Sequence, residues 1–242
     1  MNLAWLLKKN LYHPVLAQFN RLRGVQLERA DQTAWREEAQ RGELTFHKNN
    51  TWRDSPAFMR DTIALFESFG FGRGDYAGRR VVDLGAGSKL RAKFFEDAEW
   101  IAIEPLAEAC LADIGWCDLD DAAAVYAQPA EELLPELVDT TDLLFSINVL
   151  DHCYDFEAIM ANVYAYLKPT SGLAFLSFDC HFVTDRMHPL ILTDEICVPL
   201  FERLGFTIER KSKGFTGKFR EATGSDTYGH GKYCLNYWLR KN

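Results

Sequence analysis

The sequence lacks the features that mark several large classes of protein. Its 242 residues contain no apolar stretch long enough to cross a bilayer, no repeat at a fixed period and no low-complexity linker. None of the six cysteines belongs to a C-x-x-C pair, so the sequence indicates neither a zinc knuckle nor a thioredoxin-type dithiol. With 48% hydrophobic residues, a chain of this length can bury a substantial core. We therefore expect one large domain whose cysteines are buried, free thiols.

The beginning of the chain does not resemble a secretory signal, because its apolar run precedes its lysines and no small-residue cleavage site follows. Together with free thiols, this pattern predicts a cytoplasmic protein. Apolar residues recur at near-helical spacing across residues 1–24, with an interruption at Pro14. We interpret residues 1–53 as an N-terminal helical cap or lid. Peripheral membrane contact through residues 1–24 is the alternative.

The net charge is −8, but both ends of the chain are basic. Residues 1–24 carry four basic residues and no acid, and residues 203–242 carry nine basic and three acidic residues. The acidic body between them argues against nucleic-acid binding, which needs a contiguous basic surface. A small-molecule or glycan partner, with an anionic one among the options, fits this distribution better. The sequence does not indicate an oligomeric state.

Residues 54–242 have the pattern of a single α/β domain. A helix is predicted from Asp54 to Phe69, and beyond it short β-like runs alternate with helical stretches, as in a parallel sheet covered by helices. The runs are 79–85, 99–105, 123–128, 141–150 and 171–178, followed by a pair at 206–215 and 232–241. We predict five strand–helix steps and a final strand pair that encloses a polar, glycine-bearing insert at 214–233.

The most specific segment is VVDLGAGS, residues 81–88. A buried strand delivers Asp83 to its carboxyl end, and Gly85 and Gly87 let the backbone turn tightly against a ligand. We expect a helix to begin directly after this loop and to direct its free N–H groups to the same place. A dinucleotide fingerprint would need a third glycine where Leu90 stands, whereas an acid at Asp83 suits a ligand with an ammonium group.

This segment resembles the first motif of the class I S-adenosylmethionine-dependent methyltransferases, and the likeness covers roughly residues 79–206. It departs from the family's pattern at Lys89, where many members have another glycine. The resemblance implies a doubly wound, mostly parallel seven-stranded sheet with an antiparallel last strand. It implies S-adenosyl-L-methionine as cofactor and S-adenosyl-L-homocysteine as its product. The cofactor-binding residues implied in this segment are Asp83, Gly85, Ala86 and Gly87.

Three further segments match this family in order and spacing. In IAIEP, Glu104 ends the second strand, where the family's acid accepts hydrogen bonds from both ribose hydroxyls. In AQPAEELLP, Ala130 and Glu131 match the family's stretch that contacts the adenine. Residues 142–178 resemble the fourth strand, a D-H or H-H pair, a helix and the turn into the fifth strand. That turn, Lys168 to Gly172, is one residue longer than usual.

Polar side chains near two other segment ends complete the predicted cofactor site. Ser146 and Asn148 stand at the end of a buried strand, where uncompensated polar groups are costly. Arg53 precedes the first domain helix, in a segment that could fold over the donor and bring its guanidinium near the methionine carboxylate. A solvated Arg53 is the alternative interpretation.

Transfer of a methyl group to a hydroxyl oxygen needs a base that removes the hydroxyl proton and lies within hydrogen-bond reach of it. The sequence offers His152 after the fourth strand, and Asp179 and His181 after the fifth. His152 could instead contact the donor or cap the next helix. With Asp151 and Asp185 these residues could also hold a divalent cation, but their spacing follows no fixed pattern, and we predict no metal.

We predict a methyltransferase acting at oxygen on a small molecule, a sugar or a glycan intermediate, with the insert 214–233 forming part of the acceptor site. The sequence has no N-P-P-Y or D-P-P-Y run, which argues against amino methylation of DNA bases. Two alternatives remain open. One is a methyltransferase-like protein that binds the donor without turnover, and the other is a nucleotide-dependent oxidoreductase of similar sheet order.

Overall fold

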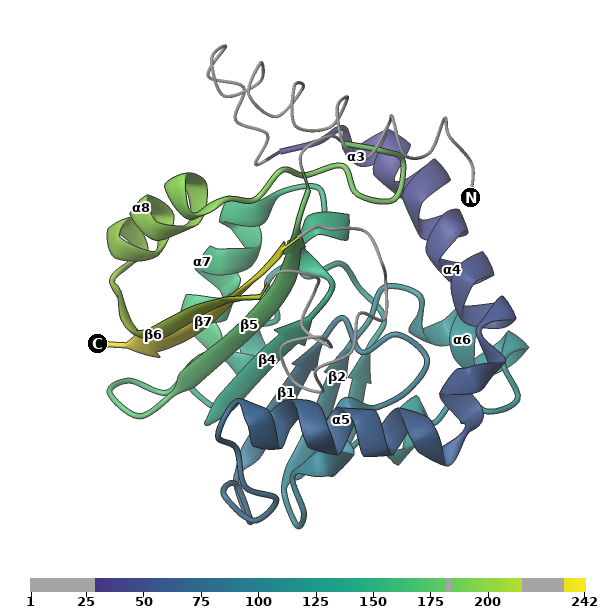
Figure 1. Cartoon of the computed structure of the whole chain (residues 1–242), viewed down its shortest axis with the longest axis horizontal. Coiled ribbons are helices and arrows are strands. Elements are labelled where there is room, and N and C mark those ends of the chain that lie inside the picture. Colours follow the sequence, from purple (N-terminus) through teal and green to yellow (C-terminus); the bar gives the residue numbers. More distant parts are fainter. Residues whose placement is uncertain (1–28, 182–183, 215–232) are drawn as a thin grey trace.

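The computed structural model describes residues 29–181, 184–214 and 233–242. They form a seven-stranded sheet in the order β3-β2-β1-β4-β5-β7-β6, with helices on both faces (Figure 1). The strands are β1 (Arg80–Leu84), β2 (Glu99–Ile103), β3 (Ala124–Tyr126), β4 (Leu143–Ile147), β5 (Leu173–Cys180), β6 (Phe206–Gly214) and β7 (Tyr233–Lys241). Strands β1 to β5 pair in parallel, and β7 is antiparallel to both β5 and β6. This topology confirms the predicted sheet, including its antiparallel last strand.

The described residues also form six α-helices, of which the first three precede β1, and several short helical turns. The α-helices are α3 (Gln32–Ala34), α4 (Gln40–Asn49), α5 (Pro56–Ser68), α6 (Ala107–Asp113), α7 (Phe156–Tyr166) and α8 (Asp194–Leu204). A π-helical turn, η2 (Trp35–Ala39), joins α3 to α4, and the 3₁₀ turns are η3 (Thr51–Asp54), η4 (Arg91–Phe94), η5 (Leu119–Asp121), η6 (Pro135–Leu137) and η7 (Leu150–His152). Helix α5 begins at a proline, whose fixed φ suits the first helical position, as the sequence predicts.

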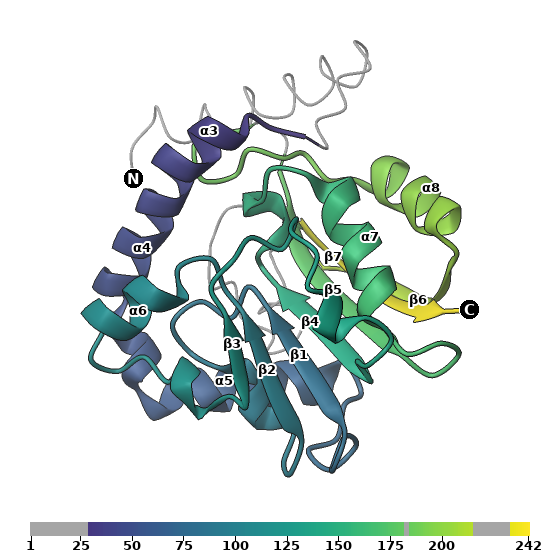
Figure 2. The same cartoon turned by 180° about the vertical axis from the view of Figure 1, so that it is seen from behind.

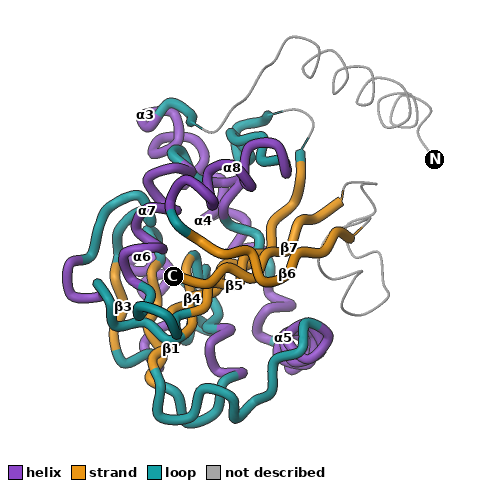
Figure 3. Tube along the Cα trace, turned by 90° about the vertical axis from the view of Figure 1, so that its left-hand side faces the viewer, coloured by secondary structure: helices purple, strands orange, loops and turns teal. Residues whose placement is uncertain are grey.

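The sheet separates two apolar layers, because successive side chains along a strand point to opposite faces. On one face, α7 and α8 pack on Leu144, Leu176 and Leu239 (Figure 2). On the other, α5 covers an aromatic cluster in which the ring centroids of Phe66 and Phe145 are 5.0 Å apart. Figure 3 shows α5 on one side of the strands and α7 and α8 on the other. With both faces covered, the carboxyl edge of the parallel strands is the place open to a ligand.

The helical segment before α5 lies beside that edge. Helix α4 lies next to α6 in Figures 1 and 2, and the Lys48 ammonium is 2.7 Å from an Asp113 carboxylate oxygen. Upstream, the indole N–H of Trp35 donates to the carbonyl of His152 (2.8 Å). Residues 32–49 are thus helical, as expected for a cap, and the boundary between a cap at 1–53 and a domain at 54–242 remains a proposal.

The prediction of a helix directly after the glycine loop is wrong. A turn and the short η4 follow β1, and only η6 lies between β3 and β4, so two of the five predicted strand–helix steps lack an α-helix. The N–H groups of Arg91 and Ala92 donate to Asp83 Oδ2 (2.9 and 3.2 Å), and the N–H of Leu90 donates to Asp118 Oδ1 (2.8 Å). The protein's own carboxylates therefore satisfy N–H groups that a helix would have presented to a ligand.

The six cysteines are free, and all except the half-buried Cys117 are buried, as the sequence predicts. Among the described residues, no helix has the length and apolar character needed to cross a membrane. Residues 1–24, which the sequence assigns to a cap or to membrane contact, lie outside the described residues. The same holds for 215–232, nearly all of the insert assigned to the acceptor site.

Candidate functional site

A cavity of about 330 Å³ lies at the carboxyl edge of the sheet. Its walls come from the segments that follow each of the strands β1 to β5 and from η2, α4 and η3. Of the residues predicted from the sequence, those on the wall are Arg53, Gly85, Ala86, Gly87, Glu104, Ala130, Glu131, Asn148, His152, Asp179 and His181. The other two, Asp83 and Ser146, do not line it. The fold thus brings together most of the predicted cofactor and catalytic residues.

The loop between β1 and η4 forms a wall with almost no side-chain volume. Gly85 and Gly87 have φ values of 76° and 66°, in the left-handed region that favours glycine. A Cβ on Gly85 would overlap the side chain of Val149, and a Cβ on Gly87 would lie 2.6 Å from His47 Cε1. Both the backbone conformation and the close neighbours therefore require glycine at these two positions.

Glu104, directly after β2, holds this loop in place. Its Oε2 accepts a hydrogen bond from the N–H of Gly87 (2.8 Å), and its Oε1 accepts one from the N–H of Leu106 (2.9 Å). Burial raises the pKa of the Glu104 carboxyl, although these two hydrogen bonds act in the opposite direction. Because each carboxylate oxygen has two lone pairs, Glu104 can also accept hydrogen bonds from hydroxyls of a ligand in the cavity.

Asp83 lies near the carboxyl end of β1, as the sequence suggests, but its side chain points to the protein's own backbone. It is 2% exposed, and its Oδ2 accepts from the two N–H groups at the start of η4. Burial raises the pKa of Asp83 to about 7, although the positive charge of Arg91 acts to lower it. The Arg91 guanidinium itself donates a hydrogen bond to Thr62 Oγ1 (2.8 Å). The carboxylate therefore holds the backbone after the glycine loop. Because Asp83 does not line the cavity, its expected contact with an ammonium group of the ligand, direct or through water, remains a prediction.

Ala130 and Glu131 lie on the cavity wall in the connection between β3 and β4. Glu131 Oε1 accepts from the N–H groups of Tyr154 and Asp155 (2.8 and 3.2 Å), and the carbonyl of Ala130 accepts from Asn162 Nδ2 (2.9 Å). Burial raises the pKa of Glu131, and its Oε2 is buried without a hydrogen-bond partner among the described residues. An acceptor atom is thus available at the position that the family resemblance assigns to the adenine.

The remaining predicted cofactor residues differ in their positions. Ser146 is fully buried within β4 and has no access to the cavity. Asn148, two residues later, lines the cavity with a φ of 61°, a conformation that is uncommon outside glycine and is enriched at functional sites. Its Oδ1 is buried and has no partner in the described part of the chain. The Arg53 guanidinium lies 5.3 Å from the centroid of the Phe58 ring.

Sequence reasoning missed the residues of α4 that close the cavity. Glu43 and His47 are four residues apart and therefore project from one face of the helix, which is the signal that could have identified them. His47 Nδ1 lies 3.0 Å from Ser88 Oγ. Burial, followed by the charge of Arg53, lowers the pKa of His47 to about 4. Other wall residues of this helical segment are Trp35, Gln40 and Phe46.

His152 is held between two carboxylates. Its Nδ1 lies 2.7 Å from Glu43 Oε1, and its Nε2 lies 3.7 Å from Asp151 Oδ2. Burial alone would lower the pKa of His152, but the charge of Asp151 and the hydrogen bond with Glu43 raise it to about 9. Burial acts to raise the pKa of Glu43, but the hydrogen bond with His152 and the charges of the surrounding histidines together outweigh it, so the pKa of Glu43 is lowered. These contacts favour the imidazolium form of His152 and attach α4 to η7.

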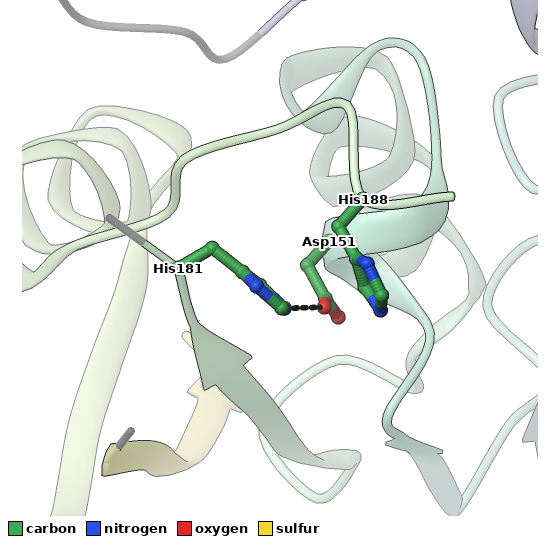
Figure 4. Close-up of side chains that lie close together, drawn as sticks. All are labelled: Asp151, His181 and His188. Atoms are coloured by element: carbon green, nitrogen blue, oxygen red, sulfur yellow. Dashed lines mark hydrogen bonds and ion pairs between the residues drawn. The ribbon is translucent and has the colours of Figure 1, made fainter. Parts of the chain in front are cut away.

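Two more histidines meet Asp151 beside this group (Figure 4). His181 Nε2 lies 2.8 Å from Asp151 Oδ2, and the side chain of each is at most 3% exposed. The ring of His188 stacks on that of His181 with centroids 4.2 Å apart and lies 4.4 Å from that of His152. Burial would raise the pKa of Asp151, but the charge of His152 and the hydrogen bond from His181 hold it well below its ordinary range. Three imidazoles therefore surround one buried carboxylate.

Asp179, the second-last residue of β5, also lines the cavity. Its Oδ1 is buried and has no hydrogen-bond partner among the described residues. The carboxylates of Glu43 and Asp151 both contact histidines, whereas Asp179 Oδ1, like Glu131 Oε2, can accept a proton or a hydrogen bond from a ligand.

The sequence matches no protein-family model and no curated protein. The fold is similar to many solved structures. One is the [4+2]-cyclase SpnF, with a TM-score of 0.65, 14% identity and coverage of 90% of this chain and 99% of that one. Another is 1,6-didemethyltoxoflavin-N1-methyltransferase of Burkholderia thailandensis with bound 1,6-didemethyltoxoflavin and S-adenosylhomocysteine. Its TM-score is 0.56 and its identity 14%, and the likeness covers 90% of this chain and 94% of that one.

A third is phosphoethanolamine N-methyltransferase 2 of Haemonchus contortus in complex with S-adenosyl-L-methionine, with a TM-score of 0.53 and 15% identity. That likeness covers 81% of this chain and 59% of the other. The sheet order, the position of the glycine loop and these likenesses agree with one another. The chain has the fold of the class I S-adenosylmethionine-dependent methyltransferases.

Proposed function

We propose that the chain is an S-adenosylmethionine-dependent methyltransferase that acts at an oxygen of a small molecule, a sugar or a glycan intermediate. The observation that carries this proposal is a single cavity that joins the Gly85–Gly87 loop and Glu104 to Asp179 and a group of imidazoles. The first set suits an adenosyl group with a methionine tail. The second offers polar groups for an acceptor and for its proton.

On the donor side, each role follows from a contact described above. Glu104 accepts hydrogen bonds from the ribose hydroxyls, and the backbone at Gly85–Gly87 admits the methionine portion at close range. Glu131 presents to the adenine amino group its Oε2, which has no hydrogen-bond partner in the described part of the chain. Asn148 and Arg53 offer an amide and a guanidinium to the polar ends of methionine. Asp83 positions the loop without touching the ligand.

On the acceptor side, we assign the base to Asp179. When the donor is bound, its sulfonium supplies a methyl group for an in-line displacement in which the carbon–sulfur bond breaks as a carbon–oxygen bond forms. The acceptor hydroxyl must lose its proton, and Asp179 Oδ1 is free to accept it. Both nitrogens of His152 face carboxylates, and His181 is turned towards Asp151, so these two histidines orient groups around the acceptor.

Two alternatives are retained because specific observations favour them. SpnF has a similar fold and is named a [4+2]-cyclase, so this fold also serves chemistry other than methyl transfer. Two of the similar structures act at nitrogen according to their names, which makes a nitrogen acceptor the alternative to oxygen. A nucleotide-dependent oxidoreductase is disfavoured, because Leu90 occupies the place of the third glycine of its fingerprint.

Donor binding is the first test. Isothermal titration calorimetry of the wild-type chain is expected to show one S-adenosylmethionine site and no binding of NAD. Glu104→Gln should weaken donor binding about 10- to 100-fold, as expected for loss of hydrogen bonds to a charged group. Glu108→Gln, the same change at an exposed position of α6, is the matched control and should bind normally. A folded wild-type chain that does not bind the donor contradicts the proposal.

Turnover is the second test. Mass spectrometry of reactions with hydroxyl-bearing and amine-bearing acceptors should detect products heavier by one methyl group. Asp179→Asn is expected to lower the rate about 10²- to 10⁴-fold while donor affinity stays unchanged, as for loss of a general base. Methylation of amines alone would contradict the assignment of oxygen. Donor binding without any methylated product would favour the alternative of a binding protein or another enzyme class.

A further inference from the structure

The group formed by Asp151, His181 and His188 has the composition of a metal site (Figure 4). One potential ligand atom from each residue lies within 4.8 Å of the others. Asp151 comes from η7 after β4, whereas the two histidines come from the connection after β5. Two imidazoles and one carboxylate converge here from separate segments, in a place where Asp151 and His181 are buried.

We propose that these three side chains bind one divalent first-row transition-metal ion. Two imidazoles and a carboxylate suit zinc, iron(II) or cobalt(II), whereas magnesium and calcium prefer oxygen ligands. Catalytic metal sites usually have three protein ligands and keep a further coordination position open, whereas structural sites are closed by four protein ligands. Three protein ligands beside the cavity fit the first kind. From the sequence we expected no metal, because the candidate ligands follow no fixed spacing along the chain. The structure shows that the segments after β4 and β5 meet, which the spacing does not reveal.

The surrounding carboxylates support this assignment. Metal-bound histidines usually donate their other ring N–H to a carboxylate or carbonyl, which fixes the ring. His188 fits this pattern, because its Nδ1 lies 2.9 Å from Asp185 Oδ1, and its Nε2 is the nitrogen left for a metal. The same Asp185 oxygen accepts from the N–H groups of Met187 and His188 (2.9 and 2.8 Å), so it is itself held in place.

Asp151 also has the free capacity that a ligand needs. Its Oδ1 is fully buried without a hydrogen-bond partner among the described residues, an arrangement that is costly unless something binds there. Its Oδ2 lies 2.8 Å from His181 Nε2. Two ligands about 2.1 Å from a tetrahedral ion are about 3.4 Å apart, so metal binding requires a shift of roughly half an ångström between these side chains.

The position of the ion would serve the acceptor side of the cavity. His181 and His188 line the cavity, as does Asp179, the proposed base. A metal at this point can hold an oxygen of the acceptor and make its hydroxyl more acidic, so that Asp179 receives the proton more readily. This use of the metal rests on the proposed methyl transfer, whereas metal binding itself does not.

Cobalt(II) provides a direct test, since its visible absorption reports the ligands. The untagged chain is stripped with a chelator, dialysed and titrated with Co²⁺ in the absence of donor. We expect one equivalent to bind with visible bands, Zn²⁺ to displace it and Mg²⁺ to leave the spectrum unchanged. His188→Ala and His181→Ala should abolish the spectrum, and Asp185→Asn should weaken binding about 10- to 100-fold. His47→Ala, which removes a cavity histidine outside the group, should retain it.

The outcomes separate this proposal from the proposed function. A folded wild-type chain without Co²⁺ bands, or bands that survive both histidine substitutions, would overturn the metal site. Circular dichroism of each variant checks folding, and His188 is the safer position because its side chain is 25% exposed. Donor calorimetry in chelator is run alongside. Metal binding without donor binding supports the metal site and contradicts the methyltransferase proposal, and donor binding without metal binding does the reverse.

Discussion

The contact between α4 and the glycine loop predicts a specific effect of adding one methyl group. In Gly87→Ala, alanine must adopt a φ of 66°, which costs about 1–2 kcal/mol. Its Cβ would also lie 2.6 Å from His47 Cε1, so the imidazole must move and lose its hydrogen bond with Ser88, at about 1 kcal/mol more. We expect the free energy of unfolding to fall by about 2–3 kcal/mol in total.

Gly78 provides the matched control for this substitution. Its φ is 67°, and nothing lies within 4 Å of a Cβ built on it, so Gly78→Ala should show the conformational cost alone. Urea denaturation of the ligand-free chain measures both variants. When both substitutions are made in a His47→Ala background, Gly87→Ala and Gly78→Ala should lower the free energy of unfolding by similar amounts. The coupling energy between Gly87→Ala and His47→Ala should then be about 1 kcal/mol. Equal costs in the wild-type background would refute the packing of α4 on this loop.

Burial leads to two other expectations. The unfolded chain protonates His47 below about pH 6.5, but the folded chain does so only below about pH 4, so stability is lost as the pH falls through this window, by about 3 kcal/mol. Urea denaturation of wild type and His47→Gln from pH 7 to pH 4 measures the difference, and parallel curves would contradict it. A thiol reagent should modify only Cys117 rapidly in the native chain and all six cysteines in urea. Rapid modification of several thiols in the native chain would refute the burial of the other five cysteines.

The sequence predicted the sheet well because its strands are short, apolar and bounded by clear turns. Asp83, Gly85 and Gly87 were expected at a strand end, and β1 ends there. Glu104 was expected at the next strand end, and it lies directly after β2. The run predicted at 123–128 also contains a strand, β3. Continuous apolar runs and glycines at tight turns are local properties, so the local sequence shows them.

The parts that the sequence did not predict depend on contacts between distant segments. Nothing near Asp83 indicates that its carboxylate accepts N–H groups eight and nine residues later and so replaces a helix. Glu43 is 109 residues from His152, and no local pattern reports their hydrogen bond. His188 follows the same rule, because its neighbours in the site become visible only when the loops after β4 and β5 are placed side by side.

Helix α4 contacts the cavity at two separate points, through His47 to the glycine loop and through Glu43 to His152. A ligand that binds between these points and contacts α4 prefers the state in which the helix is docked. Thermodynamic linkage is reciprocal, so occupancy of the cavity stabilises the docked helix by the same factor by which docking raises ligand affinity. A change that depopulates the docked state lowers the apparent affinity in proportion to the fraction lost. The local stability of residues 32–49 and the affinity of the cavity for its ligand are therefore coupled in this fold.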